Sequence, residues 1–301
     1  MTNSAGSAQL GLYAAGYSGD GGPAQDAGFA GIETIALSPA GDLYVLDGDR
    51  VRLITGLGKP APAPVISSGG VVNAFSYSGG GVVPGELVTI FGSGFGAASV
   101  EEYQPVNNSF PPVLGRLKVL FGTQAAAITA VGPGQINVVA PQSFLSSQTT
   151  IPVRVQVDAT LSAAVQVPVV GAAPGLATVG ATGTGQGAIL NEDGSPNSAS
   201  HPAPRGSVIS LFGTGEGLDS QQLPFGGLVI STPYPFAEQT VDVTIGGQPA
   251  EVPYAGSAPS LVQGVLQINV RIPEQATTGT VPVELTIGGV ESTQTVTVAV
   301  Q

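Results

Sequence analysis

The chain has no cysteine and no tryptophan, a single histidine, and only eight lysine and arginine residues in 301. Without cysteine it can form no disulfide, thiolate metal site or cysteine nucleophile. The formal net charge is −12, and so few basic residues cannot neutralise phosphates, which argues against nucleic acids and anionic membrane surfaces as partners. The absence of tryptophan weakens the case for carbohydrate stacking, although tyrosines could serve.

Long apolar runs and helical periodicity are also missing. No run reaches the roughly 18 apolar residues of a membrane span, and no stretch keeps a helical period for several turns. Residues 1–6 carry neither the basic nor the apolar region of a secretory leader. The chain is therefore either cytosolic or lacks a leader and further upstream sequence, and we favour the second interpretation.

The composition that remains is typical of a folded all-β protein. Hydrophobic residues make up 42% of the chain, which excludes the low hydrophobicity of disordered segments. Valine, isoleucine and threonine dominate the patterned runs, while 45 glycines and 25 prolines supply turns.

The last two-thirds of the chain contains the same series of motifs twice. Three matches follow in the same order: residues 84–96 with 204–217, 135–141 with 267–273, and 151–155 with 281–285. Such ordered self-similarity indicates a tandem duplication. The repeated motifs are strands and glycine turns without reactive side chains, so the duplication predicts a scaffold.

Alternating apolar and polar residues predict the fold of each repeat. Segments 153–157, 165–167, 241–245, 283–287 and 296–300 have the period of half-buried strands. Short strands with frequent turn signals favour immunoglobulin-like sandwiches. We predict an all-β chain with a short N-terminal β segment (1–57) and two tandem immunoglobulin-like β-sandwiches (65–172 and 173–301). Alternating prolines at 58–64 predict a stiff, extended boundary.

Four segments of the second repeat carry a resemblance: residues 186–198, 204–217, 243–247 and 266–270. They are similar to the C-terminal module, without an assigned activity, of many secreted acidobacterial (Solibacter-type) proteins. That module resembles tandem IPT/TIG immunoglobulin-like domains. The resemblance covers about residues 70–301 and implies no activity for any residue of this chain.

The N-terminal segment resembles one NHL propeller repeat. The likeness lies in the glycine-rich residues 19–24 and in the strand-like residues 40–47, and such repeats often precede the C-terminal module in related proteins. A propeller needs about four to eight blades. With one visible blade, the resemblance implies either a piece of a longer precursor or a repurposed blade.

Two features superficially suggest enzymes. The glycines of 92–96 and 213–217 follow strands, as in a phosphate loop, but no helix follows them, so turns with positive φ are the better interpretation. A Ser-His-Asp triad would have to use His201, yet the chain lacks a Gly-x-Ser-x-Gly elbow, and we expect an exposed loop histidine. Paired carboxylates carry no signal, because any two of 20 acids would qualify.

Three further groups could bind a ligand or a cation. The Gln-Ile-Asn motifs at 135–137 and 267–269 are expected to satisfy backbone groups at strand ends. Oxygen-rich clusters could hold calcium, but they lack EF-hand spacing, and turn capping is the default interpretation. The clusters are Asp42, Asp47 and Asp49, and Asn191, Glu192 and Asp193. The loop 101–110 interrupts the first repeat and is either a binding insertion or simply a longer loop.

The sequence favours a non-enzymatic extracellular or cell-surface structural or adhesive protein with no catalytic, cofactor-binding or metal-binding residue. Its expected partners are other copies of itself, in a homo-oligomer or filament, or other cell-surface components. The N-terminal strands are the candidate assembly strands, with Ile35, Leu37, Leu43, Val45, Val51 and Leu53 as the residues involved. The alternatives are an accessory or anchoring module of a larger secreted propeller protein or enzyme and, with less support, a carbohydrate-binding module in which Tyr13, Tyr17, Tyr44, Tyr77, Tyr103, Tyr234 and Tyr254 replace tryptophan.

Overall fold

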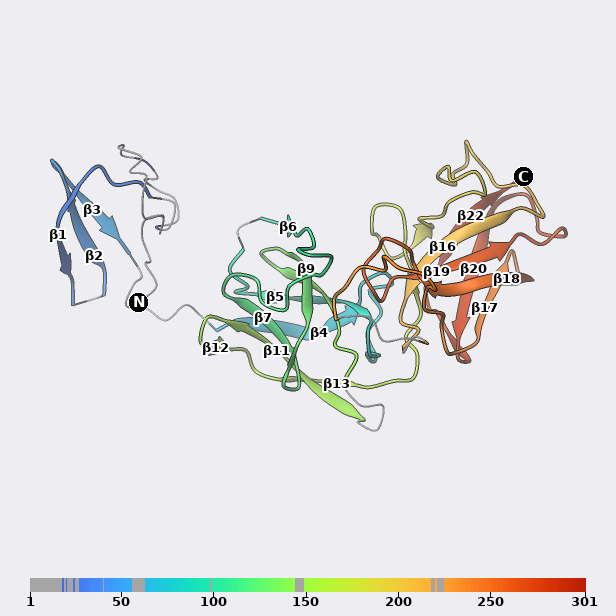
Figure 1. Cartoon of the computed structure of the whole chain (residues 1–301), viewed down its shortest axis with the longest axis horizontal. Coiled ribbons are helices and arrows are strands. Elements are labelled where there is room, and N and C mark those ends of the chain that lie inside the picture. Colours follow the sequence, from blue (N-terminus) through green and yellow to red (C-terminus); the bar gives the residue numbers. More distant parts are fainter. Residues whose placement is uncertain are drawn as a thin grey trace. The chain divides into compact units, whose positions relative to one another are not determined.

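The computed structural model describes residues 18, 20, 24, 27–39, 41–55, 63–97, 99–143, 149–217, 220 and 225–301. Within these residues the regular structure consists of strands β1 to β22, without an α-helix (Figure 1). The chain divides into two compact units, Met1–Pro62 and Ala63–Gln301. No helix in the described part is long and apolar enough to cross a membrane.

The first unit contains a three-stranded antiparallel sheet of order β1-β2-β3. Its strands are β1 (Ile32–Leu37), β2 (Leu43–Asp47) and β3 (Arg50–Ile54). Gly41 (φ 84°) and Gly48 (φ 62°) take the left-handed conformation in the two connecting turns, which glycine adopts without steric cost. The predicted strand–turn–strand pattern is therefore present. Most of the glycine-rich loop 19–24 and most of the boundary 58–64 lie outside the described residues.

The second unit begins with a β-sandwich, here called the first sandwich. One sheet has the order β4-β5-β10-β9-β6, and the other has the order β12-β11-β7-β8 with β13 also paired to β11. The strands are β4 (Val65–Asn73), β5 (Leu87–Ser93), β6 (Glu101–Glu102), β7 (Leu117–Phe121), β8 (Gln124–Ala125), β9 (Ala127–Val131), β10 (Gln135–Val139), β11 (Thr150–Val157), β12 (Thr160–Leu161) and β13 (Val165–Pro168). The longer strands β4, β5, β9 and β10 lie in one sheet, and β7, β11 and β13 lie in the other. In chain order these are the first, second, fourth and fifth strands against the third, sixth and seventh, as in an immunoglobulin constant-type domain.

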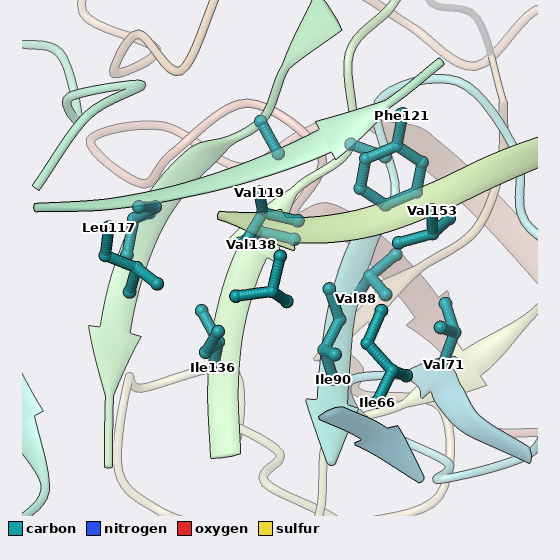
Figure 2. Close-up of a cluster of buried hydrophobic side chains, with 14 of the residues drawn as sticks. Ile66, Val71, Val88, Ile90, Leu117, Val119, Phe121, Ile136, Val138 and Val153 are labelled. Carbon is teal, nitrogen blue, oxygen red and sulfur yellow. The ribbon is translucent and has the colours of Figure 1, made fainter. Parts of the chain in front are cut away.

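The core of the first sandwich lies between these two sheets. Alternate residues of β11 are buried, so that Ile151, Val153 and Val155 face the opposite sheet. Figure 2 shows side chains of both sheets meeting in this core, among them Phe121, which is 1% exposed. The alternation that predicted these strands from sequence thus reflects one face packed on the core and one face directed outward.

The second sandwich repeats this arrangement. Its strands are β14 (Gly175–Leu176), β15 (Gly185–Gln186), β16 (Val208–Thr214), β17 (Val241–Ile245), β18 (Gln248–Ser257), β19 (Leu266–Arg271), β20 (Gly279–Ile287), β21 (Val290–Glu291) and β22 (Val296–Val300). β14-β16-β19-β18 forms one layer and β17-β20-β22 the other, and β18 continues from one into the other. Its first residues pair with β17 and its last with β19, with a register shift between Glu251 and Tyr254.

The two sandwiches are equivalent residue by residue in their central strands. Asn137 of β10 pairs with Thr89 of β5, and Asn269 of β19 pairs with Ser210 of β16. The predicted all-β fold with two tandem immunoglobulin-like sandwiches is therefore confirmed. Each sandwich has a separate hydrophobic core, and a third apolar cluster contains residues of both.

Candidate functional site: the exposed sheet of the first unit

Strand β1 presents apolar side chains to solvent along its whole length. All six of its residues are exposed, including Ile32 at 56%, Ile35 at 60% and Leu37 at 68%. Isolated exposed apolar residues are ordinary, but several on one strand mark an interaction surface or an aggregation liability. Glu33 is the only charged residue in the strand.

Described residues that precede β1 cover one face of strands β2 and β3. Arg52 of β3 donates to the carbonyl oxygen of Ser18 (2.8 Å) and to the carboxylate of Asp20 (2.8 Å), and its guanidinium lies 4.6 Å from the ring centre of Phe29. Asp47 accepts a hydrogen bond from the amide of Gly31 (2.7 Å). These contacts bury Val45 and Arg52 and leave β1 uncovered by any described residue.

The six candidate assembly residues therefore fall into different environments. Ile35, Leu37, Val51 and Leu53 are exposed, whereas Leu43 is half-buried and Val45 is 2% exposed. The first four are available to a partner. Val45 contributes to the small core of the unit, because the 27–29 segment covers its face of the sheet.

Among the described residues, β1 pairs only with β2. Its other side is an edge whose backbone amide and carbonyl groups can extend the sheet with a further strand. Natural edge strands are usually blunted by lysine, proline or a bulge. β1 contains neither lysine nor proline, and its one irregularity lies at its start, between Ile32 and Thr34.

The glycine-rich segments of the sandwiches are turns. Gly94 and Gly96 have φ of 74° and 86°, and Gly215 and Gly217 have φ of 94° and 84°. A β-carbon at Gly215 would overlap the carbonyl group of Ala173, so this position also needs glycine for space. No helix follows either segment among the described residues.

The two Gln-Ile-Asn motifs differ from expectation. Asn137 Oδ1 accepts hydrogen bonds from Gln135 Nε2 (2.8 Å) and Thr89 Oγ1 (3.0 Å). In the second sandwich, Asn269 Oδ1 accepts from Gln267 Nε2 (2.9 Å) and Ser210 Oγ (3.0 Å). The residues therefore form side-chain ladders across paired strands instead of capping strand ends, because they occupy the outward face of central strands.

The acidic clusters serve local structure. Asp47 is engaged by Gly31, while Asp193 Oδ1 accepts from both the amide (2.9 Å) and the hydroxyl (2.6 Å) of Ser195. These hydrogen bonds from Ser195 lower the pKa of Asp193. Throughout the described residues, no group of three or more His, Asp or Glu side chains is arranged to hold a metal ion.

His201 is exposed in a turn, with Nδ1 placed 3.1 Å from the hydroxyl of Ser200. This is the exposed loop position that the sequence predicts for His201. Of the tyrosines, Tyr13 and Tyr17 lie outside the described residues, Tyr77 donates to the carbonyl of Ala181 (3.1 Å), and Tyr254 donates to that of Ser257 (2.9 Å).

The 101–110 loop binds the second sandwich. Ser109 Oγ donates to the carbonyl of Phe225 (3.0 Å), and the amide of Phe110 donates to the carbonyl of Gly226 (2.9 Å). Asn107 and Asn108 have positive φ (52° and 60°), as asparagine tolerates in tight turns. The loop therefore connects the two sandwiches, a role that neither sequence interpretation named.

Sequence reasoning missed a buried carboxyl group. Glu86 is 1% exposed, and burial raises its pKa to about 8, although hydrogen bonds from the amide of Val83 and the side chain of Asn73 oppose the change. Asn73 Nδ2 lies 2.9 Å from Glu86 Oε1 and 2.8 Å from the carbonyl oxygen of Ala173. The Pro-Gly-Glu triplet at the start of a strand gives no sign of burial, because the cover comes from distant residues.

No protein-family model matches the chain, and no curated protein matches it. Solved structures with some likeness include SGBP-B from a complex xyloglucan utilization locus in Bacteroides uniformis. That match has 14% identity, covers 79% of this chain and 49% of the other, and has a TM-score of 0.23.

Two further likenesses are of the same kind. SGBP-B of the Bacteroides ovatus mixed-linkage glucan utilization locus, in complex with a mixed-linkage heptasaccharide, is 15% identical, with 86% of this chain and 51% of the other covered and a TM-score of 0.32. The I9–I11 tandem from titin is 9% identical, with 89% and 76% covered and a TM-score of 0.21. The chain spans about half the length of the two SGBP-B proteins. With TM-scores this low, the likenesses support no conclusion about function.

Proposed function

We propose that this chain is a non-enzymatic, extracellular structural or adhesive protein that associates with other copies of itself by β-strand addition at β1. The observation that carries the proposal is the edge of β1, where six exposed residues coincide with a side that no described residue pairs with. A second copy is the simplest partner, since an edge strand can pair with the same strand of another molecule.

The two sandwiches act in this proposal as a scaffold. Their conspicuous features support a structural role: glycines occupy turns, polar motifs form ladders, and acidic clusters cap loops. The low content of lysine and arginine leaves little means of binding nucleic acid.

Sedimentation velocity of the full chain over a range of concentrations tests the edge directly. The variant Ile35→Lys with Leu37→Lys places charges along β1, where lysine opposes strand addition. We expect the wild-type chain to form larger species as concentration rises and this variant to remain monomeric. A wild-type chain that stays monomeric throughout would refute the proposal.

A second candidate function is an accessory part of a larger secreted propeller protein or enzyme. It is favoured by the sheet face opposite the covered one, where Tyr44, Val51 and Leu53 are 43%, 68% and 50% exposed. A propeller blade buries such a face against the next blade. The matched variant Val51→Lys with Leu53→Lys separates the two functions. If association is lost in this variant but kept in Ile35→Lys, Leu37→Lys, the contact lies on the exposed face of the sheet and not at the β1 edge.

A further inference from the structure

The two sandwiches share a third buried apolar cluster, here called the joint. The first sandwich contributes Leu87, Phe110, Ala127 and Val139, and the second contributes Phe212, Phe225, Leu228, Ala258, Val262 and Val265. Ala127, Val139 and Ala258 are at most 2% exposed. This degree of burial is that of a domain core, so the joint is a packed interface and not a flexible connection.

Hydrogen bonds surround the apolar residues of the joint. The amide of Leu87 donates to Thr214 Oγ1 (3.0 Å), and that hydroxyl donates to the carbonyl of Gly264 (2.6 Å). The amide of Leu228 donates to the carbonyl of Asn108 (2.8 Å). Main-chain groups of both sandwiches are thus satisfied across the joint, and separating the sandwiches would leave them to be rehydrated.

Three of the four joint residues on the first sandwich form a row of paired residues. Ala127 of β9 pairs with Val139 of β10, which pairs with Leu87 of β5. All three belong to the apolar cluster, and they lie at the end of the sheet nearest to the second sandwich.

The equivalent row of the second sandwich is charged. Glu251 of β18 pairs with Arg271 of β19, which pairs with Val208 of β16. Arg271 donates to the Glu251 carboxylate (2.9 Å) and to the carbonyl of Gly206 (2.8 Å), and both charged side chains are about half exposed, at 46% and 66%. A sandwich docked here in the manner of the joint would have to desolvate this ion pair.

The other half of the joint is also present in one repeat only. In the second sandwich the connection 258–265 between β18 and β19 supplies Ala258, Val262 and Val265. In the first sandwich the corresponding strands, β9 and β10, are joined by residues 132–134, with sequence Gly-Pro-Gly. This short turn has no apolar side chain of that kind to offer.

We infer that the duplicated sandwiches have diverged so that the joint forms once per chain, between unlike halves, and cannot propagate from one copy of the chain to another. Identical repeats with apolar surfaces at both ends would stack head to tail without limit, which arrays prevent with polar end surfaces. The ion pair of Glu251 and Arg271 is such a polar surface. The inference deepens the proposed function, because it assigns association between copies to the β1 sheet and rigidity to the joint.

Transferring the charged row into the first sandwich tests this inference. The variant is Ala127→Glu with Val139→Arg in the full chain, and its control is the reverse transfer, Glu251→Ala with Arg271→Val. Because the chain has no cysteine, spin labels at Arg154→Cys and Asp242→Cys, both exposed sites, report the distance between the sandwiches.

We expect a narrow distribution of distances between the spin labels for the wild type and the control, and a broad one for the charged variant. In calorimetry, we expect the sandwich pair to unfold in one transition in the wild type and in two transitions in the charged variant. A narrow distribution in the charged variant would overturn the inference. Association of the control that rises with concentration would also overturn the inference. Such association would mean that the new apolar row finds a free surface equivalent to the 258–265 connection, which the inference says the first sandwich lacks.

A glycine pair keeps the test decisive if the charged variant fails to fold. Gly264 has φ of 95°, and a β-carbon there would overlap the carbonyl of Gly85 in the first sandwich. Gly247 has φ of 73° with no atom within 4 Å of such a β-carbon. Both alanine variants carry backbone strain, but only Gly264→Ala also places an atom against the first sandwich. We therefore expect only Gly264→Ala to broaden the distribution of distances between the spin labels.

The inference about the joint is tested independently of the proposed association through β1. All labelled samples carry Ile35→Lys and Leu37→Lys, which removes association through β1 from the measurement. Equal broadening in both alanine variants, or in neither, would refute the joint, whatever sedimentation shows for β1.

Discussion

The buried carboxyl of Glu86 makes the stability of the sandwich pair depend on pH. In the folded chain, burial raises its pKa from 4.5 to about 8. The folded protein therefore retains a proton that the unfolded chain releases near pH 4.5. Between these values unfolding releases a proton, so the free energy of unfolding falls as pH rises from about 4.5 to about 8 and levels off above.

The size of the effect follows from the displacement of the pKa. Each tenfold change in proton affinity corresponds to about 1.4 kcal/mol. A change from 4.5 to about 8 therefore corresponds to a loss of up to ~5 kcal/mol across the window. This is a large part of the ~5–15 kcal/mol that stabilises an ordinary domain.

Glu86→Gln removes the ionisation and keeps the shape. Oε1 of Glu86 accepts from Asn73 Nδ2 and Oε2 accepts from the amide of Val83 (both 2.9 Å). A glutamine has one acceptor oxygen, so one of these bonds is lost, at about 1–2 kcal/mol. We expect the variant to be less stable than wild type below about pH 5 and more stable above about pH 8.

Urea denaturation of both proteins between pH 4 and pH 9.5 measures this difference, in which contributions of unchanged groups cancel. Glu291→Gln, at an exposed position in β21, controls for the loss of one negative charge. Parallel stability curves for wild type and Glu86→Gln would refute the assignment of a buried neutral carboxyl.

Three further predictions concern packing in other places. Phe121→Ala should destabilise the first sandwich by about 3–5 kcal/mol in urea denaturation, because this large core side chain is only 1% exposed. Gly92→Ala should destabilise by about 1–3 kcal/mol, since its β-carbon would overlap the carbonyl of Val65, whereas Gly171→Ala, with no atom within 4 Å, should be neutral or slightly stabilising. Arg52→Met should remove hydrogen-exchange protection at the Gly28 amide, because the guanidinium ties residues 18 and 28 to β3.

The strands were predictable because periodicity in this chain reflects burial directly. In β11, alternate residues are buried and alternate residues face outward, so the sequence pattern and the structure coincide. The duplication also predicted that both repeats would share one topology. The exposure of Ile35 and Leu37, by contrast, could not be predicted from β1, because the residues of a strand do not show whether a partner covers them.

The joint was not predictable for a related reason. Val139 looks like any core valine, yet it faces outward and is buried by the second sandwich, while Arg271 occupies the same position in the repeat. Comparing the repeats position by position reveals the difference, but its meaning depends on which end of each sandwich touches the other. The ladders of Asn137 and Asn269 were misjudged because sequence alone does not distinguish the centre of a sheet from the end of a strand.

Electron microscopy of the full chain at increasing concentration, with the mass of the particles measured in parallel, shows whether copies of the chain assemble through β1. We expect ordered assemblies built from the intact chain that disappear in the Ile35→Lys, Leu37→Lys variant. Dispersed particles with the mass of one chain at every concentration would contradict this expectation.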